Sequence, residues 1–282
     1  MRPSPSEGVR GARPSCLLVA SGKGGVGTSC IAALVALAAA ARGEQVLLVD
    51  ATESAGAQHQ LFGVRPSQSI WMLADSRVHP DNALVDLGDN LTILAGGTSG
   101  GAVTPSSDHE RRTALTRLAH VYSRYSFIVF DGGSRLDTVT AISELVDPSL
   151  LLVTSADRLA LAANYALVKC VCTRRPNAIV SVLANRHGES VASEACEFLV
   201  GACTHFLNRT IDIAGSIPDD PCLQAAVGAG MSIHDAFEGS PASDAVRDLI
   251  TRFIPTWPTD PQPQGQAASL SATSSPSSRR WS

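Results

Sequence analysis

The stretch SGKGGVGTS (residues 21–29) follows the apolar run CLLVA (16–20). A buried strand that runs through a glycine-rich turn into a helix is typical of a phosphate-binding loop. In the P-loop pattern G-x-x-x-x-G-K-[ST], backbone N–H groups bind phosphate, the Lys reaches the β- and γ-phosphates, and the hydroxyl binds Mg²⁺. Gly22, Gly27 and Ser29 match this pattern, but Thr28 stands where the pattern has Lys. Three alternatives follow: a nucleotide site that works differently, a site that has lost its chemistry, or a glycine turn without a ligand.

Short apolar runs alternate with longer helical stretches on the carboxyl side of this loop. The predicted strands are 16–20, 45–49, 91–95, 126–130, 149–153, 178–184 and 211–215. The predicted helices are 29–42, 109–123, 137–146, 157–172, 189–207 and 242–253. This alternation predicts an α/β fold, a doubly wound and mainly parallel sheet flanked by helices. We expect a single domain over residues 14–254, a flexible leader over 1–13 and a disordered Pro/Ser-rich tail over 255–282.

Composition limits the classes of function. Hydrophobic residues make up 44% of the chain, enough for a substantial core, and the net charge of −4 gives no general attraction to nucleic acid. The pairs Arg111–Arg112 and Arg174–Arg175 are therefore expected to be solvated rather than to face DNA. No apolar run approaches the ~20 residues of a membrane span, and the 7 cysteines form no C-x-x-C pair. These features predict a cytoplasmic protein with free thiols.

Polar residues stand where three of the predicted strands end. Asp50 ends the second strand, Asp131 the fourth and Asn185 the sixth. Ligands of open α/β sheets bind at the carboxyl ends of the strands, where the glycine loop also lies. Ser29 is thus predicted to be a Mg²⁺ ligand, and Asp131 to hold the Mg²⁺ through water.

The sequence KGGVG followed by a hydroxyl pair resembles the deviant P-loop of the MinD/ParA family, K-G-G-x-G-K-[ST]. VLLVD (46–50), YSFIVFD (125–131), LANR (183–186) and AGSIPDD (214–220) resemble further segments of that family, so that the similarity runs from residue 16 to 253. The resemblance implies a P-loop NTPase fold, ATP and Mg²⁺ as cofactors, and a nucleotide-dependent homodimer. It also implies that Lys23 reaches across the dimer to the partner's phosphates, that Asp50 is catalytic and that Asn185 contacts adenine. The implied nucleotide-binding residues are Gly22, Lys23, Gly24, Gly25, Val26, Gly27, Thr28, Ser29, Cys30, Asn185, Arg186, Pro218 and Asp219.

Residues 59–100 narrow this resemblance to the flagellar-number regulators FlhG and FleN within the MinD branch. The resemblance implies an ATP-binding positional regulator of flagellar number or placement. Its implied partner is a polar or flagellar protein, such as an SRP-type GTPase or a regulator, with a peripheral position at the membrane or cell pole left open. MinD-type proteins are held at membranes by a C-terminal amphipathic helix. Here we expect the apolar face of 242–253 (Val246, Leu249, Ile250, Phe253) to pack on the sheet, and direct membrane binding to be weak or absent.

Two departures from the family pattern bear on catalysis. Thr28 replaces the Lys that neutralises phosphate charge within the same chain, and Thr52 replaces the Asp that positions the attacking water. Because electrostatics and positioning provide most of phosphoryl-transfer catalysis, we expect weak or absent ATP hydrolysis. The alternatives are a nucleotide-free pseudo-ATPase scaffold and a ParA-type DNA or cargo partition or division-site ATPase. Related iron–sulfur loading enzymes carry a C-x-x-C near the carboxyl end, which this sequence lacks.

Overall fold

A central sheet organises the computed structural model, which describes residues 14–53, 56–98, 101–102 and 104–251. Its eight strands have the order β10-β9-β8-β1-β7-β2-β4-β3, and all neighbours are parallel except β3 and β4. The strands are β1 (Ser15–Ala20), β2 (Val46–Asp50), β3 (Leu84–Asp86), β4 (Leu91–Leu94), β7 (Phe127–Gly133), β8 (Ser149–Thr154), β9 (Val180–Asn185) and β10 (Asp212–Ile217). The predicted doubly wound, mainly parallel sheet is confirmed. The leader 1–13 and the tail 255–282 lie outside the described residues.

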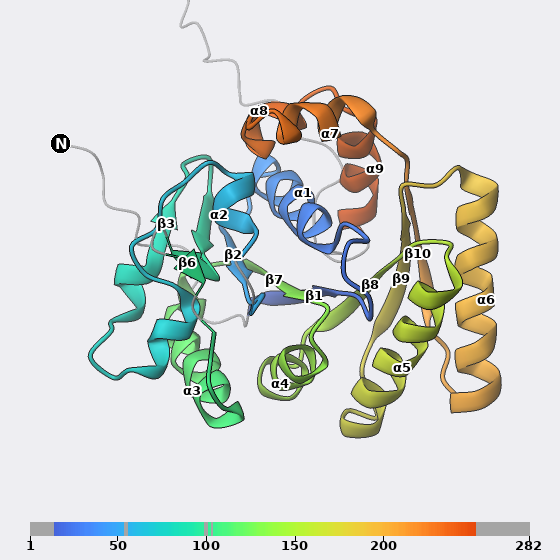
Figure 1. Ribbon diagram of the computed structural model, residues 1–282, viewed down its shortest axis with the longest axis horizontal. Coiled ribbons are helices and arrows are strands. Elements are labelled where there is room, and N and C mark those ends of the chain that lie inside the picture. Colours follow the sequence, from blue (N-terminus) through green and yellow to red (C-terminus); the bar gives the residue numbers. More distant parts are fainter. Residues whose placement is uncertain (1–13, 54–55, 99–100, 103, 252–282) are drawn as a thin grey trace, which may run out of the picture.

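Helices cover both faces of the sheet, as Figure 1 shows. One face carries α3 (Asp108–Leu118), α4 (Leu136–Val146), α5 (Arg158–Arg174) and α6 (Glu189–Leu207). The other face carries α1 (Thr28–Ala41), α8 (Ile233–Phe237) and α9 (Pro241–Ile250), with α7 (Pro221–Gly228) beside them. The short α2 (Gln58–Leu61) and a hairpin of β5 (Gly97–Thr98) and β6 (Gly101–Ala102) lie near the β3 end. Three 3-10 helices complete the described elements, at Ile70–Ala74, Pro80–Ala83 and Ala119–Arg124.

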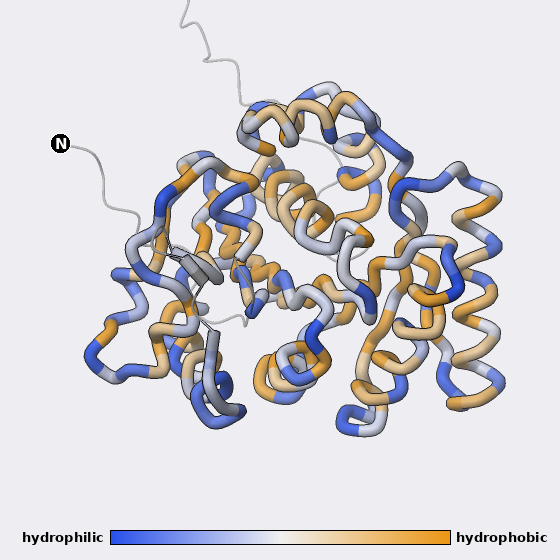
Figure 2. Tube along the Cα trace, viewed as in Figure 1, coloured by the Kyte–Doolittle hydropathy of each residue, from blue (hydrophilic) through white to orange (hydrophobic). Residues whose placement is uncertain are grey.

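Two apolar clusters, one on each face, form the core. The central strands have no polar face because helices cover both sides, and every residue of β2 is buried. Helix α1 is buried almost all round, since the sheet lies on one side and α8 and α9 on the other. Its many alanines let these neighbours approach closely, and Figure 2 shows α1 and the central strands as hydrophobic tracks. The glycine loop therefore leads into a helix that is packed on both sides.

All seven predicted strands occur, with ends that shift by three residues or fewer. The elements missing from the prediction are short: β3, the β5–β6 hairpin, α2, α7, α8 and the 3-10 helices Ile70–Ala74 and Pro80–Ala83. Strand β3 has three residues and pairs antiparallel with β4 through a turn in which Asp89 and Asn90 adopt positive φ. Helix α7 carries a recognisable start, with Asp220 as its cap and Pro221 as its first residue. The predicted helix 109–123 continues from α3 into a 3-10 turn.

The apolar face of α9 is buried inside the protein. Val246, Leu249 and Ile250 are at most 4% exposed and pack in the cluster that contains α1 and β10. The expected interior packing of this helix is confirmed for these residues, whereas Phe253 lies outside the described residues. Among the described helices, none is long and apolar enough to cross a membrane.

Substituting Val246→Ala should lower the free energy of unfolding by about 1–3 kcal/mol, because the removed methyl groups leave a cavity against α1. Denaturant unfolding measures this change, and Asp248→Ala on the exposed side of α9 is the matched control. A Val246→Ala variant as stable as the control would show that this face does not pack in the core.

Candidate functional site

The glycine loop of residues 21–27 joins the end of β1 to the start of α1 and opens onto a cavity. Gly25 and Gly27 adopt left-handed φ values of 84° and 93°, which favour glycine, and no described side chain caps α1. The amides of the first turn therefore face the cavity without a capping group, an arrangement that binds anions. The cavity of about 480 Å³ is lined by Gly24, Gly25, Gly27, Thr28, Ser29, Cys30, Thr52, Glu53, Gly132, Gly133, Ser134 and Arg135.

Helix α5 anchors the start of the loop. The Gly22 amide donates to Asn164 Oδ1 at 2.5 Å, and Asn164 Nδ2 donates to the Val153 carbonyl at 3.0 Å. A Cβ at Gly22 would lie 2.2 Å from the backbone of Ala163, so only glycine allows this approach. The shape of the loop thus depends on backbone contacts and does not require a Lys at position 28.

The structure brings Asn185 and Arg186 from the end of β9 to the same loop. Asn185 Nδ2 donates to the Val26 carbonyl at 2.8 Å and would contact a Cβ at Gly27 at 2.3 Å. Arg186 pairs with Asp219 at 3.4 Å, which ties β9 to the segment after β10. Pro218 precedes Asp219 in that segment and is half-buried. Asn185, which is expected to contact adenine, therefore lies near the expected nucleotide-binding residues Arg186, Pro218 and Asp219, although contact with a base stays a prediction.

Lys23 is held by its own chain. Its Nζ donates to both carboxylate oxygens of Asp157 at 3.0 Å, and the two side chains are 41% and 42% exposed. Asp157 also caps α5 by accepting from the Ala160 amide at 3.0 Å. Hydrogen bonds from Ser155, Ala160 and Lys23 hold the pKa of Asp157 well below its usual range. The Lys23 ammonium is thus turned toward the start of α5 in the single chain.

Two carboxylates lie side by side behind the loop, because Asp50 and Asp131 are partners in the register of β2 and β7. Both are fully buried. Asp131 accepts from Gln58 Nε2 at 2.8 Å, from the Gly133 amide at 3.2 Å and from the Ser29 hydroxyl. Burial, and then the negative charge of Asp50, raise the pKa of Asp131 to about 7 despite these bonds. The site therefore contains negative charge that its own donors do not fully compensate.

This arrangement fits a hydrated divalent cation. A carboxylate at Asp131 and a hydroxyl at Ser29 are oxygen ligands of the kind Mg²⁺ prefers. Gln58 Nε2 also donates to the Ser29 carbonyl at 3.0 Å, and Gln58 Oε1 is buried without a hydrogen-bond partner among the described residues. A water bound to the metal would donate the hydrogen bond that Gln58 Oε1 lacks. The expected metal residues Ser29 and Asp131 are thus brought together, and Gln58 is an addition that the sequence did not indicate.

Asp50 has a different environment from Asp131. Its Oδ1 accepts from the Thr52 amide and hydroxyl, and its Oδ2 accepts from the amides of Ala57 and Gln58 at 2.8 and 2.9 Å. Four donors thus satisfy this carboxylate and fix the path of the chain after β2. Thr52 lines the cavity, but its hydroxyl is directed at Asp50. The direct contacts of Asp50 therefore hold the backbone, and its expected catalytic role stays a prediction.

Glu53 forms a buried ion pair that the sequence did not reveal. Its carboxylate, 1% exposed, accepts from Arg111 Nε at 2.6 Å and from the Thr138 hydroxyl. Burial opposes the charge, but the bonds from Arg111 and Thr138, then the charges of Arg111 and Arg135, hold the pKa of Glu53 below its usual value. The expectation that Arg111 is solvated was wrong, because its side chain is 6% exposed and neutralises Glu53. Arg112 remains partly exposed, at 37%, beside Asp108 and Glu144.

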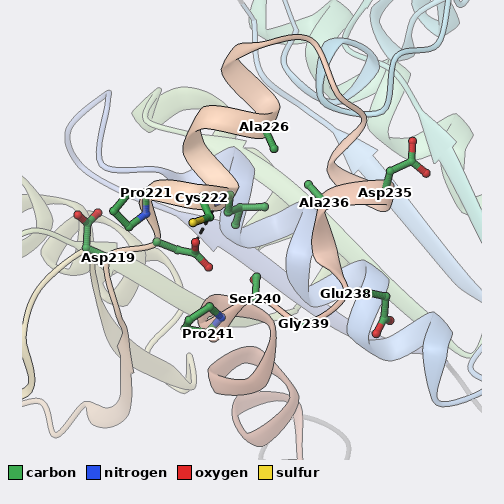
Figure 3. Close-up of a pocket in the computed structure, with 12 residues that line it drawn as sticks. Asp219, Pro221, Cys222, Ala226, Asp235, Ala236, Glu238, Gly239, Ser240 and Pro241 are labelled. Atoms are coloured by element: carbon green, nitrogen blue, oxygen red, sulfur yellow. Dashed lines mark hydrogen bonds between the residues drawn. The ribbon is translucent and has the colours of Figure 1, made fainter.

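A second cavity, of about 390 Å³, lies among α7, α8 and the start of α9 (Figure 3). Its rim carries Asp219, Asp235 and Glu238, which lie apart in the close-up rather than converging on one point. Among the described residues, no group of three metal-ligating side chains is close enough to hold an ion. The glycine-loop cavity is therefore the candidate site for a phosphate ligand.

Comparisons with known proteins agree with this geometry. A ParA family profile, described as an NUBPL iron-transfer P-loop NTPase, matches residues 14–84. The Antiactivator FleN of Pseudomonas aeruginosa is 24% identical over 255 residues, 88% of this chain and 89% of the relative. The fold matches the septum site-determining protein MinD complexed with Mg-ADP from Pyrococcus horikoshii (TM-score 0.66, 21% identity, 85% of this chain and 95% of that one). The chain has a MinD/ParA-type P-loop fold. The resemblance to this family and to FleN, expected from the sequence, is confirmed.

A further match concerns an assembly. A chain of the MinC:MinD cell division protein complex of Aquifex aeolicus gives a TM-score of 0.66 at 21% identity, covering 89% of this chain and 98% of that chain. At this identity the likeness concerns the fold alone.

Raising the pH from 5 to 8 should lower the thermal midpoint of the wild type by about 2–4 °C more than that of Asp131→Asn for each ~1 kcal/mol of linked stability, because a carboxyl whose pKa is raised to about 7 in the folded protein must lose its proton over this range. Differential scanning fluorimetry at pH 5 and pH 8 without nucleotide measures both shifts, with exposed Asp212→Asn as the control. A pH-dependent shift in Asp131→Asn as large as that of the wild type would contradict the assignment of uncompensated negative charge at Asp131.

Proposed function

We propose that this chain is a MinD/ParA-like ATP-binding positional regulator with weak or lost ATP hydrolysis. The observation that carries the proposal is the cavity where the uncapped start of α1 lies beside Ser29, whose hydroxyl donates to buried Asp131. Backbone N–H groups at a helix N-terminus favour phosphate, and the carboxylate–hydroxyl pair behind them favours Mg²⁺. ATP with Mg²⁺ is the ligand that uses both features.

The residues of the site divide between the two ends of the nucleotide. The loop amides from Gly24 to Ser29 bind the phosphates, and Cys30 follows them in the first turn of α1. Ser29 is assigned as the Mg²⁺ ligand, with Asp131 acting through water. Asn185, Arg186, Pro218 and Asp219 are assigned to the adenine side, since the Asn185–Val26 and Arg186–Asp219 contacts join this region to the loop. When bound, Mg²⁺ supplies positive charge to the phosphate oxygens.

Weak nucleotide binding and weak hydrolysis are proposed because Thr28 and Thr52 line the cavity where the family pattern has Lys and Asp. Thr28 lines the cavity without a positive charge, and a charge-assisted bond is worth ~1.5–3 kcal/mol, so affinity falls about tenfold to a hundredfold. Thr52 offers a hydroxyl that Asp50 already accepts, where the family resemblance implies a carboxylate that positions water. Lys23 is paired with Asp157 within the chain, so it serves a partner's nucleotide only after that pair opens.

The biological role is proposed from the relatives. FleN, which is described as an antiactivator, matches along most of both chains, and this supports a role in flagellar number or placement. A nucleotide-dependent homodimer would then recruit a polar or flagellar partner from the cytoplasm, without strong membrane binding of its own. The buried apolar face of α9 supports the last point. The second candidate, a nucleotide-free scaffold, is favoured by the pairing of Lys23 with Asp157, which keeps the signature lysine away from the cavity.

Substituting Thr28→Lys should tighten nucleotide binding about tenfold or more, because it restores a charge beside the phosphates. Turnover should remain near background in Thr28→Lys and in Thr52→Asp, and should appear only in the double variant, since charge neutralisation and water positioning act together. Titration with a fluorescent ATP analogue and phosphate release measure the two effects.

The control for added charge is Thr210→Lys. Thr210 is exposed and lies just before β10, at the amino ends of the strands, whereas the glycine loop lies at their carboxyl ends. This control should match the wild type in both measurements. Rapid wild-type hydrolysis that Thr28→Lys leaves unchanged would refute the degenerate site. Absence of binding in every variant would favour the scaffold.

A further inference from the structure

The phosphate cavity has one cationic side chain among the described residues that line it, and that side chain is Arg135. Position 28 is a threonine, and Lys23 faces Asp157 rather than this cavity. The triphosphate of ATP carries several negative charges, which phosphate sites balance with Lys, Arg or a metal. Arg135 is therefore the one group in the described lining that is available to take the part of the missing lysine.

Arg135 lies next to the loop through its neighbour in the chain. A Cβ at Gly24 would be 3.6 Å from Ser134 Oγ, so the segment after β7 packs against the beginning of the loop. Arg135 precedes α4, and its side chain is 58% exposed. It combines a position beside the phosphate-binding amides with the freedom to turn toward a ligand.

The present contact of Arg135 does not bind it firmly. Its Nε lies 3.0 Å from Glu53 Oε2, but the same carboxylate already has Arg111 at 2.6 Å and the Thr138 hydroxyl. Arg111 is buried with Glu53, at 6% and 1% exposure, whereas Arg135 is mostly in solvent. Glu53 therefore stays paired with Arg111 when Arg135 moves, and the buried carboxylate is not left without a counter-charge.

We propose that Arg135 binds the terminal phosphates of the nucleotide in cis and supplies the positive charge that Thr28 lacks. This inference rests on the proposed nucleotide function. The planar guanidinium can donate two parallel hydrogen bonds to phosphate oxygens, which suits the task. When Arg135 turns to the phosphates, Glu53 remains paired with Arg111. Glu53 follows β2 and Arg135 follows β7, so the Glu53–Arg135 pair connects these two segments before the nucleotide binds.

The test is a set of substitutions in the full chain, titrated with a fluorescent ATP analogue. Arg135→Gln should weaken binding about tenfold, whereas Arg135→Lys keeps the charge and should retain most of the affinity. The matched control is Arg112→Gln, which removes the same charge from a partly exposed arginine that pairs with Asp108 and Glu144 on the outer side of α3 and α4. The control should bind within twofold of the wild type. A merely structural role for Arg135 would move the thermal midpoint rather than the affinity, so both are measured.

A double-mutant cycle with Thr28→Lys gives a second readout. If the lysine introduced at position 28 and Arg135 neutralise the same phosphates, Arg135→Gln should cost less affinity in the Thr28→Lys background than in the wild type. Equal affinities of Arg135→Gln and Arg112→Gln would overturn the inference. Binding by Thr28→Lys but not by the wild type would also overturn it while keeping the nucleotide site, whereas no binding by either protein would overturn the proposed function together with this inference.

Discussion

Two buried carboxylates at the ends of adjacent parallel strands are the constraint on which the site depends. Asp50 and Asp131 are register partners, and neither reaches solvent. Four donors from the chain after β2 satisfy Asp50, whereas the donors to Asp131 leave its pKa raised to about 7 through burial and the neighbouring charge. Burying two such groups together is costly unless a cation completes the site. Gln58 and the Ser29 hydroxyl both donate to Asp131, and the glycine loop leads into the helix that carries Ser29.

Loop shape and loop charge are separate properties in this protein. The shape comes from the close approach of Gly22 to α5, the hydrogen bond that the Gly22 amide donates to Asn164 Oδ1, and the hydrogen bond that Asn185 Nδ2 donates to the Val26 carbonyl. None of these contacts involves position 28, so replacement of a lysine by Thr28 leaves the backbone site in place. The charge is instead distributed over Lys23, bound to Asp157, and Arg135, bound to Glu53. In both pairs the cationic side chain is partly exposed, at 41% for Lys23 and 58% for Arg135.

Sequence patterns predicted the sheet and the strand-end positions of Asp50 and Asn185, because apolar runs and polar termini are local signals. Asp131 was expected to end its strand, but β7 continues two residues further, to Gly133. They did not predict the contacts that cross between elements. Arg111 and Arg112 look alike in sequence, yet Arg111 is buried because Glu53, 58 residues earlier, points toward α3. Gln58 follows a segment without a recognised motif, and only the fold places its amide between Ser29 and Asp131. Asp157 was recognisable as a helix start, but its hold on Lys23 required the three-dimensional arrangement.

The central claim is that the glycine-loop cavity, and not the cavity among α7, α8 and α9, receives the nucleotide. Backbone amide NMR of the isotope-labelled wild-type protein, titrated with Mg-ATP to millimolar concentration, tests it most directly. The claim predicts saturable shifts at Gly24, Gly25, Gly27 and Ser29, accompanied by shifts at Asn185 and Arg186. Shifts restricted to Cys222, Asp235 and Gly239, or no shifts at all, would contradict it.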